Sequence, residues 1–131
     1  MTGTGWVRPQ PLLAVADVPA ASRWYQQFLG ARRGHGGDDY DRLLVSGAIV
    51  LQLHHRDVLH HYDALADPTT PVGNGVAVWF EVDEFDAAVG RSRELDAQIE
   101  LDVHVNPNAG QREIWLRDLD GYLVVLAESV S

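Results

Sequence analysis

The stretch Leu12–Gly30, LLAVADVPAASRWYQQFLG, decides the fold. Its uninterrupted apolar run, Leu12–Ala16, predicts a buried strand. Asp17 can cap the helix that follows, Pro19 suits the first helical turn, and Gly30 can supply the left-handed residue that ends the helix. The large apolar residues of this helix recur at helical spacing: Trp24, Tyr25, Phe28 and Leu29. The stretch therefore predicts a strand followed directly by a helix.

The second half of the chain repeats this pattern. Val76–Val82 predicts another strand, and the apolar residues after it form one face of a second helix. An offset of 67 residues, close to half of the 131-residue chain, superimposes the strand end, the helix entry and the helix core of the two halves. The offset maps Val15 to Val82, Val18 to Phe85, Ala20 to Ala87, Ala21 to Ala88 and Phe28 to Leu95. We therefore expect a duplicated unit.

Further strands are expected after each helix. The polar, glycine-rich segment Arg32–Asp41 is expected to form a loop that contains at most a short strand. The remaining expected strands are 42–46, 48–54, 98–105, 113–117 and 122–127, with turns at 106–110 and 118–121. The predicted fold class is α+β: two tandem βαβββ modules that form a curved, partly open mixed sheet around a concave ligand cavity.

The length fits one domain, residues 1–131, with module one at about 8–60, a linker at about 61–74 and module two at about 75–130. The formal net charge of −9 makes nucleic acid a poor partner, because phosphate binding needs a basic surface. No apolar stretch approaches the roughly 20 residues that cross a bilayer, and the first residues do not resemble a signal peptide. The absence of cysteine excludes disulfides and thiolate chemistry, and it fits a cytoplasmic protein.

Three stretches resemble motifs of the vicinal oxygen chelate superfamily, which contains glyoxalases, bleomycin-resistance proteins and extradiol dioxygenases. They are VADV at 15–18 with WYQQFLG at 24–30, FEVD at 80–83 with DAA at 86–88, and RE at 112–113 with RDLDGY at 117–122. Leu119 replaces the proline that is usual in the third motif. The resemblance covers nearly the whole chain. It implies the paired βαβββ fold and a small-molecule ligand, but fold alone does not decide function.

The resemblance also implies where a metal-dependent member would hold its divalent ion. The ligand positions on the first strands are Gln10 and Ala77, and those on the last strands are Gln52, or Leu51 if the register shifts by one residue, and Val125. Alanine and valine cannot bind a metal, and amide oxygens are weak ligands. We therefore expect no cofactor. The alternative is a divalent metal ion in a rearranged site that uses His54, His104 or Glu113.

Seven residues are predicted to contact a ligand: Gln10, Gln52, His54, Trp79, His104, Glu113 and Trp115. His54 either caps a strand end or contacts the ligand, and Glu113 is either a salt-bridged carboxylate or a general base or counter-ion. Trp79 and Trp115 either pack in the core or stack on a flat ligand. His55, His60 and His61 fit a solvated loop, and Trp24 fits the core.

These residues favour a metal-free binding protein that sequesters an aromatic or cationic compound, such as an antibiotic, as the bleomycin-resistance relatives do. Such relatives commonly form homodimers, so a homodimer is expected. The alternative is an enzyme of the same fold, namely a lyase, isomerase or dioxygenase, with a rearranged metal site or with His54 or Glu113 as its base. Whether the protein is an enzyme stays open at this level. An interaction domain is a third possibility that no residue requires.

Overall fold

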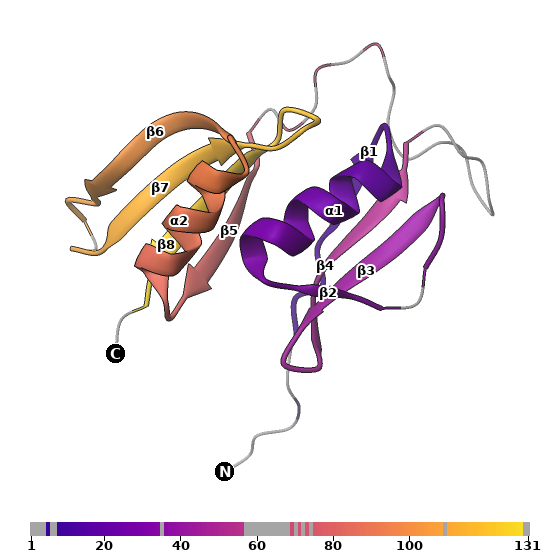
Figure 1. Ribbon diagram of the computed structural model, residues 1–131, viewed down its shortest axis with the longest axis horizontal. Helices are drawn as coiled ribbons and strands as arrows, with labels where there is room; N and C mark the ends of the chain where they lie inside the picture. The colour runs from indigo at the N-terminus through magenta and orange to yellow at the C-terminus, as the bar shows by residue number, and fades with distance from the viewer. Residues whose placement is uncertain are drawn as a thin grey trace.

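The chain forms two units of the same design (Figure 1), as seen in a computed structural model that describes residues 5, 8–34, 36–56, 69, 71, 73, 75–108 and 110–129. The first unit consists of β1 (Leu12–Val15), α1 (Val18–Leu29), β2 (Arg32–Arg33), β3 (Tyr40–Val45) and β4 (Ala48–His55). The second unit consists of β5 (Ala77–Val82), α2 (Phe85–Glu94), β6 (Gln98–Val105), β7 (Arg112–Arg117) and β8 (Leu123–Glu128). The twice-repeated βαβββ order confirms the predicted duplication.

Each unit builds its own mixed sheet. The strand orders are β1-β4-β3-β2 and β5-β8-β7-β6, and no strand pairs with the other sheet within the described residues. In each sheet the first and last strands of the unit are parallel and the other neighbours are antiparallel. The α+β fold class is therefore confirmed, with the mixed sheet divided into two four-stranded halves.

The first helix has the ends that its sequence predicts. Asp17 is the cap, and its side chain accepts a hydrogen bond from Ala20 N at 3.0 Å. Gly30 ends the helix at φ 67°, a left-handed conformation that costs a residue without a side chain little. The second helix begins differently, because Glu84 occupies the cap position and makes no side-chain capping bond. The exposed carboxylate of Glu84 therefore lies at the start of α2 without a hydrogen bond to the helix.

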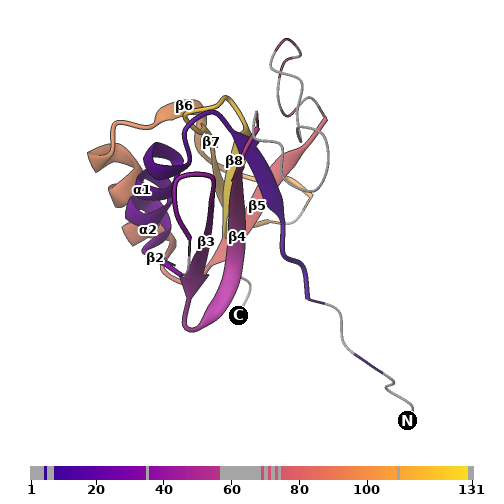
Figure 2. The ribbon, with the colours of Figure 1, turned by 90° about the vertical axis from the view of Figure 1, so that its right-hand side faces the viewer.

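Both helices lie on the same side of the sheets (Figure 2). The side chains that alternate toward α1 and α2 form the core, which includes Leu13, Val15, Leu51, Leu53, Val78, Ile114, Leu116, Val124 and Leu126. The other face of each sheet has no helix on it, and we call it the open face. The open faces carry the remaining residues of each strand, among them most of the predicted ligand contacts.

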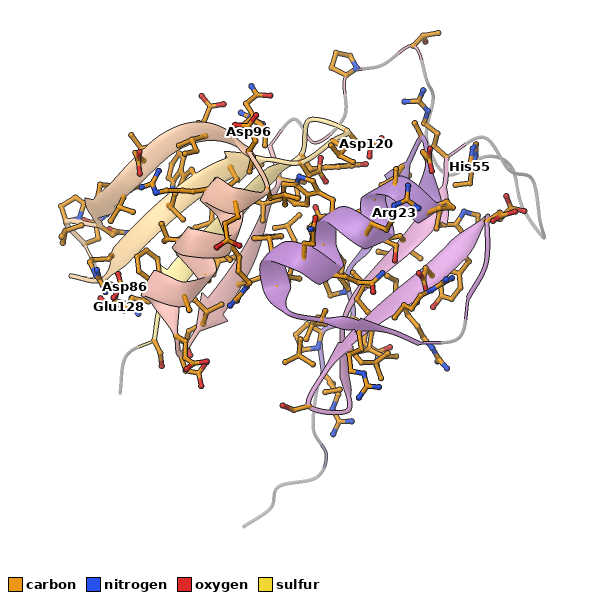
Figure 3. The ribbon with its side chains drawn as sticks, in the orientation of Figure 1. Arg23, His55, Asp86, Asp96, Asp120 and Glu128 are labelled. Atoms are coloured by element: carbon orange, nitrogen blue, oxygen red, sulfur yellow. The ribbon has the colours of Figure 1, made fainter. Side chains whose placement is uncertain are left out.

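A five-residue turn, Asp118–Tyr122, ties the second unit to the first. The Tyr25 hydroxyl of α1 donates to Asp118 Oδ2 at 2.5 Å, and Ala16 N donates to Asp120 Oδ1 at 2.8 Å. The Tyr122 hydroxyl donates to the carbonyl oxygen of Ala14 at 2.8 Å. Figure 3 marks Asp120 at the boundary of the two units. We call this contact the first junction.

The predicted and observed strand ends differ most at β3. The segment 32–41 contains the short strand β2, as the prediction allowed, but β3 begins at Tyr40 rather than at Arg42. The ladder extends because Tyr40 pairs with His54, at the far end of the long strand β4. Glycine and aspartate neighbours conceal this pairing in the sequence, since strand propensity reflects cross-strand contacts more than backbone preference.

Part of the sequence prediction falls outside the described residues. His35, His60, His61 and Trp6 lie there, as does most of the connection between the units. His55 is the last residue of β4 and is half-buried, so it is not part of a loop. No helix in the described ranges is both long and apolar enough to cross a membrane.

Candidate functional site

The open face of the second sheet carries an apolar row across all four strands. The strand registers align, in order, Trp79, Val125, Trp115 and Leu101. Trp79 is 51% exposed, whereas Val125 between the two tryptophans is fully buried. Neighbouring strands lie ~4.8 Å apart, so the backbones that carry the two indoles are about 10 Å apart. Because Val125 has no solvent-accessible surface, neighbouring side chains already cover it, and the aromatic surface open to a ligand consists of the exposed indole of Trp79 and the accessible part of Trp115.

A buried carboxylate lies beside this row. Glu113 accepts hydrogen bonds from Asn106 Nδ2 at 2.7 Å and from Trp115 Nε1 at 3.0 Å. His104 Nε2 lies 3.6 Å from Glu113 Oε1, and the His104 ring meets Trp115 edge-on. His104 Nδ1 lies 2.8 Å from the carbonyl oxygen of Asp102, which places a proton on Nδ1. Nε2 then attracts the carboxylate only when the ring is an imidazolium. Glu113 thus fixes the orientation of Trp115 by accepting a hydrogen bond at the N–H edge of its indole.

The open face of the first sheet is polar. The Tyr40 hydroxyl donates to Gln52 Oε1 at 2.7 Å, and Gln52 Nε2 donates to the carbonyl oxygen of Gln10 at 2.9 Å. His54 meets the Tyr40 ring edge-on, and its Nδ1 lies 2.8 Å from the carbonyl oxygen of His55. Gln52 therefore uses both ends of its amide to hold β3 and the segment before β1 against β4.

The strand registers show whether Gln52 and Val125, the last-strand positions at which a metal-dependent member would hold its ion, are equivalent in the two sheets. Gln52 aligns with Leu12 on β1, and Val125 aligns with Trp79 on β5. Leu12 and Trp79 are themselves related by the 67-residue offset. Gln52 and Val125 thus occupy the same position in the two sheets, as the sequence repeat predicts.

The residues at these positions do not fit a metal ion. Ala77 and Val125 have no donor atom, and the amide oxygen of Gln52 already accepts from Tyr40. Gln10 contributes a backbone carbonyl to Gln52. No three His, Cys, Asp or Glu side chains are grouped to hold a metal ion in the part of the chain that the structure describes. The residues at these positions therefore support no reaction step at a metal ion.

A groove between the two sheets joins their open faces. It has a volume of about 560 Å³ and is bordered by β1 on one side and β5 on the other. Leu12 and Trp79 face each other across it, and Leu12 is 41% exposed. The predicted concave surface shared by both modules corresponds to this groove, with the two polar groups on either side.

The predicted site residues fall into two groups. The second sheet brings together Trp79, His104, Glu113 and Trp115, and the first brings together Gln10, Gln52 and His54. The contacts described above lie within each group rather than between them. The sequence missed Tyr40 and Asn106. Alternation from Gln52 and His54 to their strand partners could have identified Tyr40, whereas Asn106 lies in a turn with no periodic signal.

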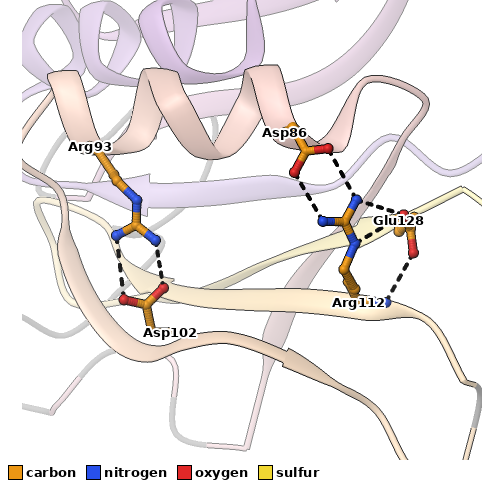
Figure 4. A network of polar contacts seen from close by, with 5 residues as sticks. All are labelled: Asp86, Arg93, Asp102, Arg112 and Glu128. Atoms are coloured by element: carbon orange, nitrogen blue, oxygen red, sulfur yellow. Dashed lines mark hydrogen bonds and ion pairs between the residues drawn. The ribbon is translucent and has the colours of Figure 1, made fainter.

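Arg112, the neighbour of Glu113, faces the other side of the sheet. Its guanidinium forms paired contacts with Asp86 and with Glu128 (Figure 4). The guanidinium also lies 4.8 Å from the centre of the Phe85 ring. Hydrogen bonds from Arg112 lower the pKa of the Asp86 and Glu128 carboxyls. Arg112 therefore links α2 to β7 and β8. Its guanidinium lies on the opposite face of the sheet from Glu113 and does not pair with that carboxylate.

Charge is distributed unequally between the units. Residues 8–56 contain six arginines and four aspartates, a net charge of +2. Residues 75–129 contain four arginines and twelve acidic residues, a net charge of −8. Three aspartates in the connection account for the rest of the −9, and all ten basic residues are arginines. The aromatic row therefore lies on the strongly acidic unit.

Two βαβββ units, a tyrosine of the first helix bonded to the aspartate-rich turn, and paired open faces define a protein of the glyoxalase-like class. The chain belongs to the Glyoxalase/Bleomycin resistance protein/Dioxygenase superfamily, whose family model matches residues 7–126. This match confirms the resemblance found in the sequence.

Solved structures have the same fold. TioX from Micromonospora sp. ML1 superposes with a TM-score of 0.74 at 21% identity, over 95% of this chain and 100% of that one. A lactoylglutathione lyase from Agrobacterium tumefaciens gives 0.73 at 22% identity, over 96% of both chains. An integron cassette protein from V. cholerae gives 0.73 at 16%, over 99% of this chain and 100% of that one. At these identities the likeness concerns the fold. Among curated proteins, none matches the sequence.

Proposed function

We propose that this protein binds a flat aromatic compound, preferably a cationic one such as an antibiotic, and sequesters it without a metal ion. The observation that carries the proposal is the row Trp79–Val125–Trp115 beside the buried carboxylate of Glu113. The exposed indole of Trp79 can stack on one face of such a ring, and the accessible part of Trp115 extends the same aromatic surface. The net charge of −8 on the second unit adds attraction for a cation, which aromatic faces also favour.

The polar group on the first sheet completes the proposed site. Tyr40 and His54 lie on the open face of the first sheet, on the far side of β1 from the groove, and they contact only a ligand that extends from Trp79 across β1. The absence of donor atoms at Ala77 and Val125 supports binding in place of metal chemistry.

The test uses 9-aminoacridine, a flat aromatic cation, and measures its fluorescence anisotropy as protein is added. Trp79→Ala and Trp115→Ala are each expected to weaken binding about tenfold, because each removes one stacking partner. Val103→Ala, which removes an exposed apolar side chain from β6, is the matched control and should bind as the wild type does. Neutral acridine should bind more weakly than 9-aminoacridine.

Elemental analysis of the purified protein provides the opposing result. A stoichiometric metal ion that survives dialysis, or that is retained when zinc, nickel or iron is added back, contradicts metal-free sequestration. It favours the alternative, an enzyme of the same superfamily with a rearranged site. In that alternative His104 and Glu113, 3.6 Å apart, are the acid–base pair in place of His54.

We also propose that the protein is a cytoplasmic homodimer. Exposed apolar side chains on the open faces, including Leu12, Trp79 and Leu101, favour a partner surface. The +2 and −8 units favour an arrangement that places unlike units together. Light scattering during size-exclusion chromatography should give twice the mass of the chain at low salt and a larger monomer fraction at high salt. A monomer under both conditions contradicts the dimer and leaves the ligand proposal to its own test.

A further inference from the structure

Duplication of the unit creates a second junction equivalent to the first. In the first junction the long turn Asp118–Tyr122 reaches from β7 and β8 to α1 and β1. The equivalent turn of the first unit, between β3 and β4, has only two residues, Ser46 and Gly47. This shorter turn faces the end of β5 and the start of α2. We call this contact the second junction.

The second junction is left partly open. A groove of about 420 Å³ occupies the place that the long turn fills in the first junction. Its floor is apolar and consists of Leu29, Val45, Val50, Phe80 and Val82. Among the described residues, one hydrogen bond crosses the junction, from Arg91 Nε to the carbonyl oxygen of Phe28 at 3.0 Å.

Equivalent residues show what the missing turn exposes. In the first unit Leu13 is 6% exposed and Val15 is fully buried. Their counterparts at the 67-residue offset, Phe80 and Val82, are only partly buried and line the groove. Apolar surface that one junction removes from water thus remains accessible in the other, and a ligand with an apolar body would gain by covering it.

Three carboxylates and one guanidinium, that of Arg91, line the groove. Glu81, Asp83 and Glu84 are all exposed, and no hydrogen bond or ion pair engages their side chains in the described part of the chain. In the first junction, by contrast, both Asp118 and Asp120 accept hydrogen bonds. The nearby Arg91 directs its Nε to a backbone carbonyl, and the surrounding unit has a net charge of −8.

We propose that the groove at the second junction binds a small organic cation with an apolar body. The apolar floor accepts the body, and the rim of Glu81, Asp83 and Glu84 accepts the cationic group. The acidic rim repels the second unit of another copy, whose net charge is −8. The site shares Val50, Phe80 and Glu81 with the groove beside Trp79 but includes neither tryptophan. It does not rest on the proposed function, because its variants are expected to leave the binding of 9-aminoacridine unchanged.

The experiment follows backbone amide signals by NMR while benzamidine is added to the ¹⁵N-labelled full chain. Benzamidine combines an aromatic ring with an amidinium, and benzamide and benzoate are its neutral and anionic counterparts. We expect benzamidine to shift the amides of Gly30, Ser46 and Glu84 in a saturable manner, and benzamide and benzoate to shift them far less.

Two variants and one matched control locate the binding. The double variant Asp83→Asn, Glu84→Gln should weaken benzamidine about fivefold, which is the scale of exposed ion pairs. Val45→Trp should abolish binding by filling the groove. Glu94→Gln removes an exposed carboxylate from the same helix, α2, outside the groove, and it should bind benzamidine as the wild type does.

Several results would overturn the site. These are equal binding of benzamide and benzamidine, unchanged affinity in the double variant, or shifts confined to the residues around Trp79 and Trp115. Shifts of Gly30, Ser46 and Glu84 that follow protein concentration without benzamidine would assign the groove to a second copy instead. Failure here leaves the binding of 9-aminoacridine unaffected, so the two proposals can be separated.

Discussion

The open faces of the two sheets share one backbone plan and differ in their chemistry. On the first sheet Tyr40, Gln52 and Gln10 form a closed chain of hydrogen bonds. On the second, the position of Gln52 is taken by the buried Val125, flanked by two tryptophans. The repeated pattern of strands and helix core therefore specifies where side chains project. What those side chains bind is set independently in each copy.

The junctions differ in the same way. The five-residue turn of the second unit fastens itself to α1 and β1, whereas the two-residue turn of the first unit leaves a groove. The longer turn thus fills the first junction, whereas the shorter turn leaves a candidate binding groove at the second. The contrast between the junctions and the contrast between the open faces can each be challenged by substitution.

The largest expected effect comes from removing the fastening at the first junction. Asp118→Ala leaves the Tyr25 hydroxyl, Asp120 N and Tyr122 N without their acceptor. Because Tyr25 is fully buried, we expect a loss of about 3 kcal/mol in the free energy of unfolding, measured by urea denaturation. Ser46→Ala, in the equivalent turn, should change it by less than about 0.5 kcal/mol. Equal losses in the two variants would contradict the difference between the junctions.

The Asp118 contribution should also depend on pH. Burial raises the pKa of Asp118 above its ordinary value. A raised folded-state pKa means that the stability from this group is complete below the unfolded value, about 3.9, and is lost as pH rises through the folded pKa. The difference in unfolding free energy between wild type and Asp118→Ala should therefore be greatest in acid and smaller at neutral pH. A difference that grows with pH would mean that the ionised form is the favoured one.

Intermediate effects are expected from exchanging the equivalent residues of the open faces. Val125→Gln places an amide in the apolar row without a partner and should cost about 2 kcal/mol of unfolding free energy. Gln52→Val removes two hydrogen bonds whose partners can turn to water, and it should cost about 1 kcal/mol. Amide hydrogen exchange near Gln10 should also quicken in Gln52→Val. If both exchanges are neutral, the faces are interchangeable and the contrast between them fails.

The smallest effect is expected at the surface of the second unit. Arg93 and Asp102 form two contacts, of 2.8 and 3.3 Å, and their side chains are 50% and 57% exposed (Figure 4). Water and salt screen such a pair, so Asp102→Ala should leave the unfolding free energy within experimental error. A clear loss of stability that disappears in high salt would show that the ion pair contributes more than its exposure indicates.

The fold was predictable because local signals and the repeat agree. Asp17, Pro19 and Gly30 mark the ends of α1, and the 67-residue offset aligns both strand–helix pairs. The alignment of Gln52 with Val125 agrees with the equivalence that the family resemblance implies, whereas the predicted ligand contacts stay predictions. Tyr40 and Asn106 were not predicted, because Tyr40 depends on its strand pairing with His54 and Asn106 lies in a turn with no periodic signal. The groove depends on a difference in turn length whose effect appears only when the two units are packed.

The arginines of this chain have a further consequence. Guanidinium groups keep their proton throughout the range in which proteins are handled, and no lysine is present to behave otherwise. The six guanidinium charges of the first unit therefore persist at alkaline pH. Only acid removes the difference in sign between the net charges of the two units, because it protonates the carboxylates of the second unit. The molecule is polarised at neutral pH and becomes uniformly positive only in acid, below the ordinary carboxyl pKa of about 4.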